Sequence, residues 1–178
     1  MQKDKEIEIK IYSLATTAKD AIVFLEEVDG IRLLPLWIGP LEGQAIAIKF
    51  SGIALPRPFT HDLMSEVLSK TGYKIKKVVL DRVKDNTYYS SIYISNGNDT
   101  HRLDSRPSDA IAMSVRTGCE IYVSQKVLDS SQVLNKPIST REVAEFKEKL
   151  KDLKPTDVFK DLQQKNKEKN QKPKDKDE

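Results

Sequence analysis

The stretch YKIKKVVLDRVKDNTYYSSIYISNGNDTHRLDS, residues 73–105, carries the clearest indication of the fold. Apolar residues alternate with polar ones in three short runs, and Val, Ile and Tyr, which favour strands, are frequent in the first two. The runs are separated at Asp85-Asn86 and at Asn96-Gly97, which are dipeptides typical of tight turns. The pattern therefore predicts a meander of three strands.

The chain before this stretch shows a similar succession of strands and a helix. Three apolar runs with strand-like alternation span residues 7–15, 21–28 and 31–39. Asp29 and Gly30 form the expected hairpin turn between the last two runs. A helix is predicted over residues 40–52 because this segment begins with proline and ends with glycine, although Gly43 inside it costs about 1 kcal/mol relative to alanine.

Two further helices are predicted, one on each side of the meander. The first begins at Thr60, whose hydroxyl is expected to cap the free amides of the first turn, and Gly72 ends it. The second covers residues 106–118 and leads into a short strand over residues 120–124.

Together these elements predict an α+β fold with a mostly antiparallel, twisted sheet and helices packed on it. The segments AIAIKF (45–50) and AIAMSV (110–115) are similar, and they lie in the first and the third predicted helix. An internal duplication of a strand-strand-helix unit would explain this likeness, and coincidence is the alternative.

The chain is expected to contain one domain, followed by a helix and a tail. Its 178 residues, of which 38% are hydrophobic, suffice for a single core. We assign the domain to residues 1–130 and a C-terminal helical extension to residues 131–153, in which apolar residues recur at helical spacing. Residues 154–178 are rich in lysine and poor in apolar side chains, so we expect a disordered tail.

The composition excludes several classes of protein. Lysine and arginine total 30 and aspartate and glutamate 27, so the formal net charge of +3 gives no general attraction for nucleic acid, and any phosphate binding must be local. The single cysteine, Cys119, excludes an internal disulfide framework and a cysteine-rich zinc site. The sequence has no signal-like apolar segment and no run of about 18 apolar residues, so we expect a soluble, cytoplasmic protein without a membrane span.

Two predicted helix starts share an arginine, a proline and an aspartate. Arg57 and Pro58 precede Thr60, His61 and Asp62, and Arg106 and Pro107 precede Ser108 and Asp109. The free amides at a helix N-terminus attract anions, and a guanidinium beside them adds a fork of donors. Both motifs are therefore typical of a phosphate site.

Carboxylates also gather in or just before the predicted first helical turns, at Glu42, Asp62, Asp104 and Asp109. Carboxylate oxygens are suitable ligands for a hard cation such as Mg²⁺, and His61 could transfer a proton or bind a softer metal. The alternative is structural, because an aspartate in a first turn caps its helix and arginines commonly pair with it. Structural roles are favoured for the remaining candidates, namely Trp37, His101 and Cys119.

Three motifs, in their order and separations, closely resemble the bifunctional nuclease domain family. They are LPLWIGPLEGQAIA (34–47), PRPFTHDLM (56–64) and LDSRPSDAIAMSVRTGCEIYV (103–123). The resemblance covers residues 7–130 and implies hydrolysis of both DNA and RNA. The positions that match the family are Glu42, Arg57, His61, Asp62, Asp104, Arg106, Ser108 and Asp109. The family often has alanine where this chain has Gly43 and Ser105.

The leading hypothesis is a metal-assisted phosphodiesterase that acts on DNA and RNA and uses Mg²⁺ or Mn²⁺. Catalytic roles are expected for Arg57, His61, Asp62 and Arg106. Phosphate binding is expected from Arg57, Thr60, Arg106 and Ser108. The expected metal ligands are Glu42, Asp62, Asp104 and Asp109.

A second hypothesis is a non-catalytic module with a regulatory role, which binds an anionic small molecule or a protein partner in the same cleft. The balanced net charge and the lack of a stripe of aromatic and basic residues favour it. For either function we expect a homodimer, because the apolar strands near Trp37 and in residues 87–95 leave a face or an edge that needs cover.

Overall fold

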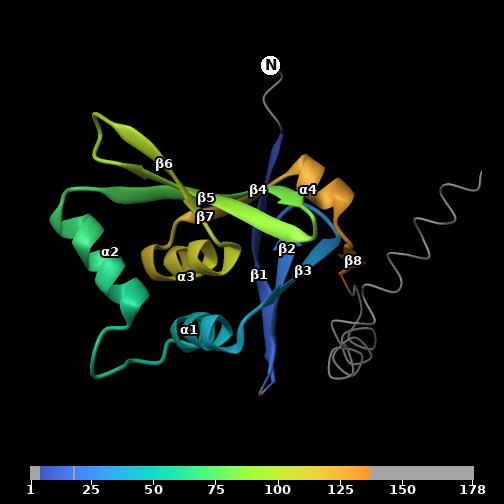
Figure 1. Cartoon of the computed structure of the whole chain (residues 1–178), viewed down its shortest axis with the longest axis horizontal. Coiled ribbons are helices and arrows are strands. Elements are labelled where there is room, and N and C mark those ends of the chain that lie inside the picture. Colours follow the sequence, from blue (N-terminus) through green and yellow to red (C-terminus); the bar gives the residue numbers. More distant parts are fainter. Residues whose placement is uncertain (1–4, 18, 137–178) are drawn as a thin grey trace, which may run out of the picture. The chain divides into compact units, whose positions relative to one another are not determined.

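The computed structural model describes residues 5–17 and 19–136 of the chain, and it confirms an α+β fold with helices packed on one large sheet (Figure 1). The strands are β1 (Glu6–Thr16), β2 (Ala21–Glu27), β3 (Arg32–Ile38), β4 (Lys74–Lys84), β5 (Thr87–Ser95), β6 (Thr100–Ser105), β7 (Glu120–Ser124) and β8 (Leu134–Asn135). The helices are α1 (Pro40–Phe50), α2 (Thr60–Lys70), α3 (Pro107–Thr117) and α4 (Gln125–Ser130).

The eight strands form one sheet in the order β6-β5-β4-β7-β1-β2-β3-β8. Every neighbouring pair is antiparallel except β4 and β7, which confirms the prediction of a mostly antiparallel sheet. The predicted turn between β4 and β5 is present, and Asp85 and Asn86 adopt φ angles of 49° and 58°, as a tight hairpin requires.

Two similar halves meet at β7 in the middle of the sheet. In each half an antiparallel meander of three strands precedes a helix that packs on the sheet. The first half consists of β1-β2-β3 and α1, and the second consists of β4-β5-β6 and α3. Helix α2 lies between the two halves in the sequence. Each half therefore contains three strands and a helix, whereas the unit considered from the sequence pattern has two strands and a helix. The similar segments at residues 45–50 and 110–115 lie in α1 and α3, which contact each other.

The core lies between the sheet and the pair of helices α1 and α3. Residues 110–113 of α3 are all buried against the middle of the sheet. Gly43 in α1 is also buried, and a Cβ atom added there would lie 2.3 Å from the Cβ of Ala21 in β2. The glycine therefore allows α1 to approach the sheet closely, which explains its presence inside a helix.

Helix α2 packs on α3 but has no buried residue of its own. Its apolar residues Leu63, Met64 and Val67 are exposed, and only Leu68 packs against the core. The predicted cap of this helix is wrong in one respect, because Phe59 is the N-cap residue and Thr60 is already helical. The Asp62 side chain caps the helix instead, since its Oδ2 atom accepts a hydrogen bond from the Phe59 amide at 2.9 Å.

Two short elements, α4 and β8, were not expected from the sequence pattern. Of the helical extension predicted at residues 131–153, only residues 131–136 belong to the described part, and β8 lies there. The rest of the extension and the tail predicted at residues 154–178 lie outside the described residues. Within the residues that the structure describes, no helix is long and apolar enough to cross a membrane.

Candidate functional site

A cleft of about 520 Å³ opens where the first turns of α1, α2 and α3 approach the strands β5 and β6. Apart from Ser105, its polar lining consists of Glu42, Thr60, His61, Asp104, Arg106 and Asp109. All six are residues that the sequence pattern singled out, although they come from three separate parts of the chain. The apolar lining consists of Leu41, Ala45, Met64, Ile92, Leu103 and Met113.

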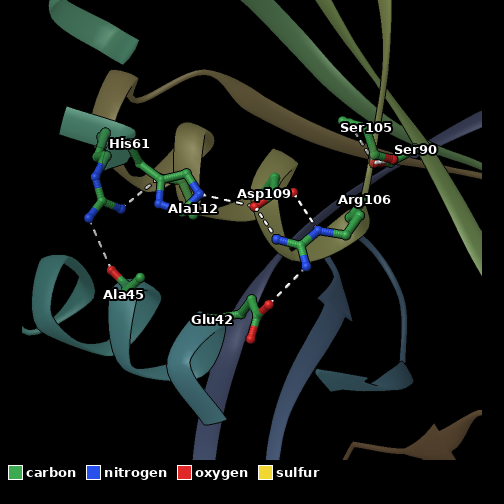
Figure 2. A network of polar contacts seen from close by, with 9 residues as sticks. Glu42, Ala45, His61, Ser90, Ser105, Arg106, Asp109 and Ala112 are labelled. Carbon is green, nitrogen blue, oxygen red and sulfur yellow. Dashed lines mark hydrogen bonds and ion pairs between the residues drawn. The ribbon is translucent and has the colours of Figure 1, made fainter. Parts of the chain in front are cut away.

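Arg106 is the centre of the polar network in this cleft (Figure 2). Its guanidinium donates to both carboxylate oxygens of Asp109, at 2.7 and 3.0 Å, and to Glu42 Oε1 at 2.9 Å. These ion pairs raise the pKa of Arg106, with Asp109 the larger cause. Because three of the five N–H donors are used in these bonds and the side chain is 64% exposed, two donors can still bind a ligand.

His61 lies beside the same carboxylate, and Figure 2 shows it in contact with Asp109. The distance from His61 Nε2 to Asp109 Oδ1 is 3.1 Å, and the side chains are 16% and 31% exposed. The His61 side chain is therefore mostly buried. Arg106 lowers the pKa of Asp109, against the opposing effect of burial, and His61 lowers it further, so Asp109 is a carboxylate at neutral pH.

Ser105 holds the end of β6 in place just before Arg106. The Ser90 hydroxyl in β5 donates to the Ser105 carbonyl at 2.8 Å, and the two hydroxyl oxygens also lie 2.8 Å apart (Figure 2). Ser90 is fully buried, whereas Ser105 is partly exposed and lines the cleft. The Ser90 hydroxyl therefore fixes the backbone from which Arg106 extends, and the Ser105 hydroxyl adds a second contact between β5 and β6.

Asp62 and Arg57 do not line this cleft but a second pocket on the other side of the first turn of α2. Asp62 Oδ1 accepts a hydrogen bond at 2.8 Å from Arg116 Nε. Burial alone would raise the pKa of Asp62, but the Phe59 amide, Arg116 and then Lys49 lower it below its ordinary value. The remaining predicted residue, Ser108, is buried in the first turn of α3 and lines neither pocket.

Arg116 is the residue that the sequence interpretation missed. Its side chain is only 3% exposed, and besides Asp62 it donates to the carbonyls of Ala112 at 2.9 Å and of Ala45 at 3.2 Å. One guanidinium thus joins α1, α2 and α3. A signal was present, because Arg116 follows Asp109 by seven residues and so lies on the same face of α3.

The four expected metal ligands do not form one cluster. Arg106 joins Glu42 and Asp109, and Asp62 is paired with Arg116 outside the cleft. Across residues 5–17 and 19–136, no three His, Cys, Asp or Glu side chains lie close enough together to hold a metal ion. The arrangement of side chains therefore does not fit a preformed site for Mg²⁺ or Mn²⁺, and we derive no catalytic step through a metal.

Aromatic and basic side chains do come together on the sheet, contrary to the expectation from the linear sequence. Lys77 in β4 lies 5.1 Å from the ring centre of Tyr93 in β5 and 5.3 Å from that of Tyr122 in β7. Arg82 lies 4.1 Å from the ring centre of Tyr89. The contacts cross neighbouring strands, so they follow from strand order and not from spacing along the chain. The linear sequence shows no stripe of aromatic and basic residues, and this was an argument against nucleic-acid binding. The contacts on the sheet remove that argument.

The structure thus defines a small α+β protein whose cleft joins a histidine, an arginine and two carboxylates by hydrogen bonds. The sequence matches the family described as bifunctional nuclease domain over residues 23–136, which is more than half of the chain. The chain therefore belongs to the bifunctional nuclease domain family, as the three motifs predicted.

The relatives of this chain differ in how much of their own length it covers. An uncharacterized protein of Mycobacterium tuberculosis is 32% identical over 145 residues, or 76% of this chain and 87% of that protein. Bifunctional nuclease 1 of Oryza sativa subsp. indica is 27% identical over 122 residues, or 66% of this chain and 37% of the plant protein. Bifunctional nuclease 1 of Arabidopsis thaliana is 24% identical over 107 residues, or 58% of this chain and 33% of the plant protein.

Proposed function

We propose that this protein hydrolyses phosphodiester bonds of DNA and RNA in the cleft that contains His61, Arg106 and Asp109. The observation that carries the proposal is the 3.1 Å contact between His61 Nε2 and Asp109 Oδ1, in a cleft that also contains a guanidinium. A histidine oriented by a carboxylate is a common general base or acid. The names of the plant relatives, bifunctional nucleases, support the same class of reaction.

In the proposed reaction His61 transfers the proton of the attacking water. With the Nε2–H group donated to Asp109, the Nδ1 atom of a neutral imidazole is an acceptor, and it makes no hydrogen bond with the described residues. Water attacks the phosphorus atom while Nδ1 takes one of its protons, the bond from phosphorus to the leaving oxygen breaks, and that oxygen takes a proton from solvent. Asp109 stabilises the imidazolium that forms and holds the ring in orientation.

Arg106 provides positive charge for the phosphate. The two N–H donors that remain after its bonds to Glu42 and Asp109 can bind a phosphate oxygen, and they stabilise the charge that grows there during attack. The two carboxylates fix the plane of the guanidinium in advance. A site that binds phosphate and does not read the base accepts both DNA and RNA.

The requirement for Mg²⁺ or Mn²⁺ stays a prediction of the sequence. Chelation tests it directly, with hydrolysis by the wild-type protein measured after treatment with a chelator and again after either ion is added back. Loss and recovery of activity would support a metal that binds together with the substrate. An unchanged rate in the chelator would show that this chain's own residues suffice.

Asp109→Asn tests the proposed role of the carboxylate. The amide keeps the shape but removes the charge that orients His61 and pairs with Arg106, so the hydrolysis rate should fall by about 100-fold or more. Asp81→Asn is the matched control, because Asp81 also pairs with an arginine, Arg102, but lies outside the cleft. Equal rates for the two variants would contradict the proposal.

The second candidate function, a regulatory module that binds a protein partner in the same cleft, is favoured by one observation. Three apolar side chains of the cleft, Leu41, Met64 and Leu103, are 76%, 48% and 42% exposed. Exposed apolar groups of this size are common where proteins bind one another. A wild-type preparation that hydrolyses neither DNA nor RNA, with or without Mg²⁺ and Mn²⁺, would favour this candidate over the nuclease.

A further inference from the structure

The second pocket, which has a volume of about 310 Å³, lies between the end of α1 and the first turn of α2. Its charged residues are Lys49, Arg57, Asp62 and Arg116. Lys49 and Arg57 are exposed, and the side chain of neither makes a hydrogen bond or an ion pair with any described residue. Two cationic side chains in this pocket are therefore available to a ligand.

The charges of the pocket favour an anion. Asp62 and Arg116 neutralise each other through their 2.8 Å contact, so Lys49 and Arg57 leave the pocket with two positive charges. The cleft differs, because three carboxylates and one guanidinium line it when His61 is neutral. A polyanion that enters this acidic cleft is repelled by the carboxylates, and it gains from cationic groups nearby that hold its other phosphates.

The two pockets adjoin at the first turn of α2. His61 lines the cleft and the next residue, Asp62, lines the second pocket. Consecutive Cα atoms are about 3.8 Å apart, so the linings of the two pockets share one short stretch of backbone. Ile53 and Leu55 line the second pocket and are exposed, which gives the sugar or base of the bound nucleotide an apolar surface.

We infer that Lys49 and Arg57 form a subsite that binds a phosphate of the nucleic acid strand next to the phosphate held in the cleft. The inference rests on the proposed nuclease function for the identity of the strand. It assigns Arg57 to substrate binding outside the cleft, and it adds Lys49, which the sequence motifs did not single out.

The experiment measures the binding of a fluorescently labelled single-stranded DNA of about ten nucleotides to the full chain. The Asp109→Asn background slows turnover by about 100-fold or more, so that binding is measured before the strand is cleaved, and Lys49→Gln and Arg57→Gln are then introduced singly and together. We expect each single change to weaken binding by about fivefold or more, and the double change to weaken it further. Each should reduce the slope of log K against log salt by about 0.7, the value for one phosphate contact on a single strand.

Lys70→Gln is the matched control, because Lys70 is an exposed lysine of α2 that lines neither pocket. It should leave both the affinity and the salt dependence unchanged. If Lys49→Gln and Arg57→Gln behave like Lys70→Gln, the subsite is wrong, whether or not the wild-type protein cleaves. If the wild-type protein binds the strand through these residues but does not hydrolyse it, the subsite stands and the proposed nuclease function fails.

Discussion

Gly43 is the residue at which helix propensity and packing oppose each other. Alanine is the better helix former by about 1 kcal/mol, but its Cβ would lie 2.3 Å from the Cβ of Ala21, which is far below contact distance. Ala21 belongs to a buried strand and cannot move freely. The contact therefore outweighs the propensity.

Gly43→Ala should lower the free energy of unfolding by about 1–3 kcal/mol, the usual cost of overpacking a core. Gln44→Ala is the control, because Gln44 is the next residue of α1 and is exposed, so its change should have little effect. Urea denaturation of both variants measures the difference. A Gly43→Ala protein more stable than the wild type would contradict the close approach of α1 to β2.

Asp62 connects stability to pH. Its pKa is lower in the folded protein than in the unfolded chain, so the stabilisation is fully present above the ordinary pKa of about 4 and is lost as the pH falls through the lowered value. Melting temperatures should therefore drop below about pH 4. Asp62→Asn removes one titrating group, so its melting temperature should fall less steeply over this range. Parallel curves for wild type and variant would contradict the lowered pKa.

The three helices of the site are joined by one side chain. Arg116 in α3 contacts Asp62 in α2 and the Ala45 carbonyl in α1, and it is almost fully buried. Asp62 also caps the first turn of α2, and His61 in the same turn lines the adjoining cleft, so the position of His61 depends on this arginine. Arg116 is thus a positioning residue for the cleft.

Arg116→Lys should lower the free energy of unfolding by about 1–3 kcal/mol, since one ammonium group cannot replace three directed bonds and leaves buried acceptors unsatisfied. Arg82→Lys is a matched control, because Arg82 is exposed and a lysine keeps the positive charge over Tyr89. Thermal or urea denaturation gives the stabilities. An Arg116→Lys variant as stable as Arg82→Lys would show that the buried bonds contribute little.

The helices and strands of the domain were largely predictable, because their signals are local. Alternation, turn dipeptides and the proline-containing helix starts indicated the strands β1 to β7 and the helices α1 to α3. The partners of the charged side chains were not predictable, because they depend on how helices pack. Asp62 looked equivalent to Asp109, yet one pairs with Arg116 and the other with Arg106 and His61.

At the scale of the whole molecule, the sheet joins two meanders through β7, and this strand order brings Lys77, Tyr93 and Tyr122 together. No spacing in the sequence indicates that arrangement, because the pairing of β4 with β7 is long-range and parallel. The membership of the family, by contrast, was predictable from three short motifs.

The expected homodimer stays a prediction at this scale. Light scattering at micromolar concentration should give about twice the chain mass of 20.2 kDa, because the chain exposes several large apolar side chains that a second copy can cover. A mass near that of one chain would contradict it.

The His61→Ala variant tests whether phosphodiester hydrolysis takes place in the cleft. The wild-type protein, His61→Ala and His101→Ala are purified identically, and each is assayed on labelled single-stranded DNA and RNA at a temperature where its melting curve shows it folded. His101 is the matched control, because it is the other histidine of the chain and lies exposed on β6, outside the cleft. We predict that the turnover number of His61→Ala is about 100-fold or more below that of the wild type on both substrates, while His101→Ala keeps the wild-type rate. A His61→Ala protein that cleaves as fast as the wild type would contradict the proposed function of the cleft, because the activity would then come from another site or from a contaminant.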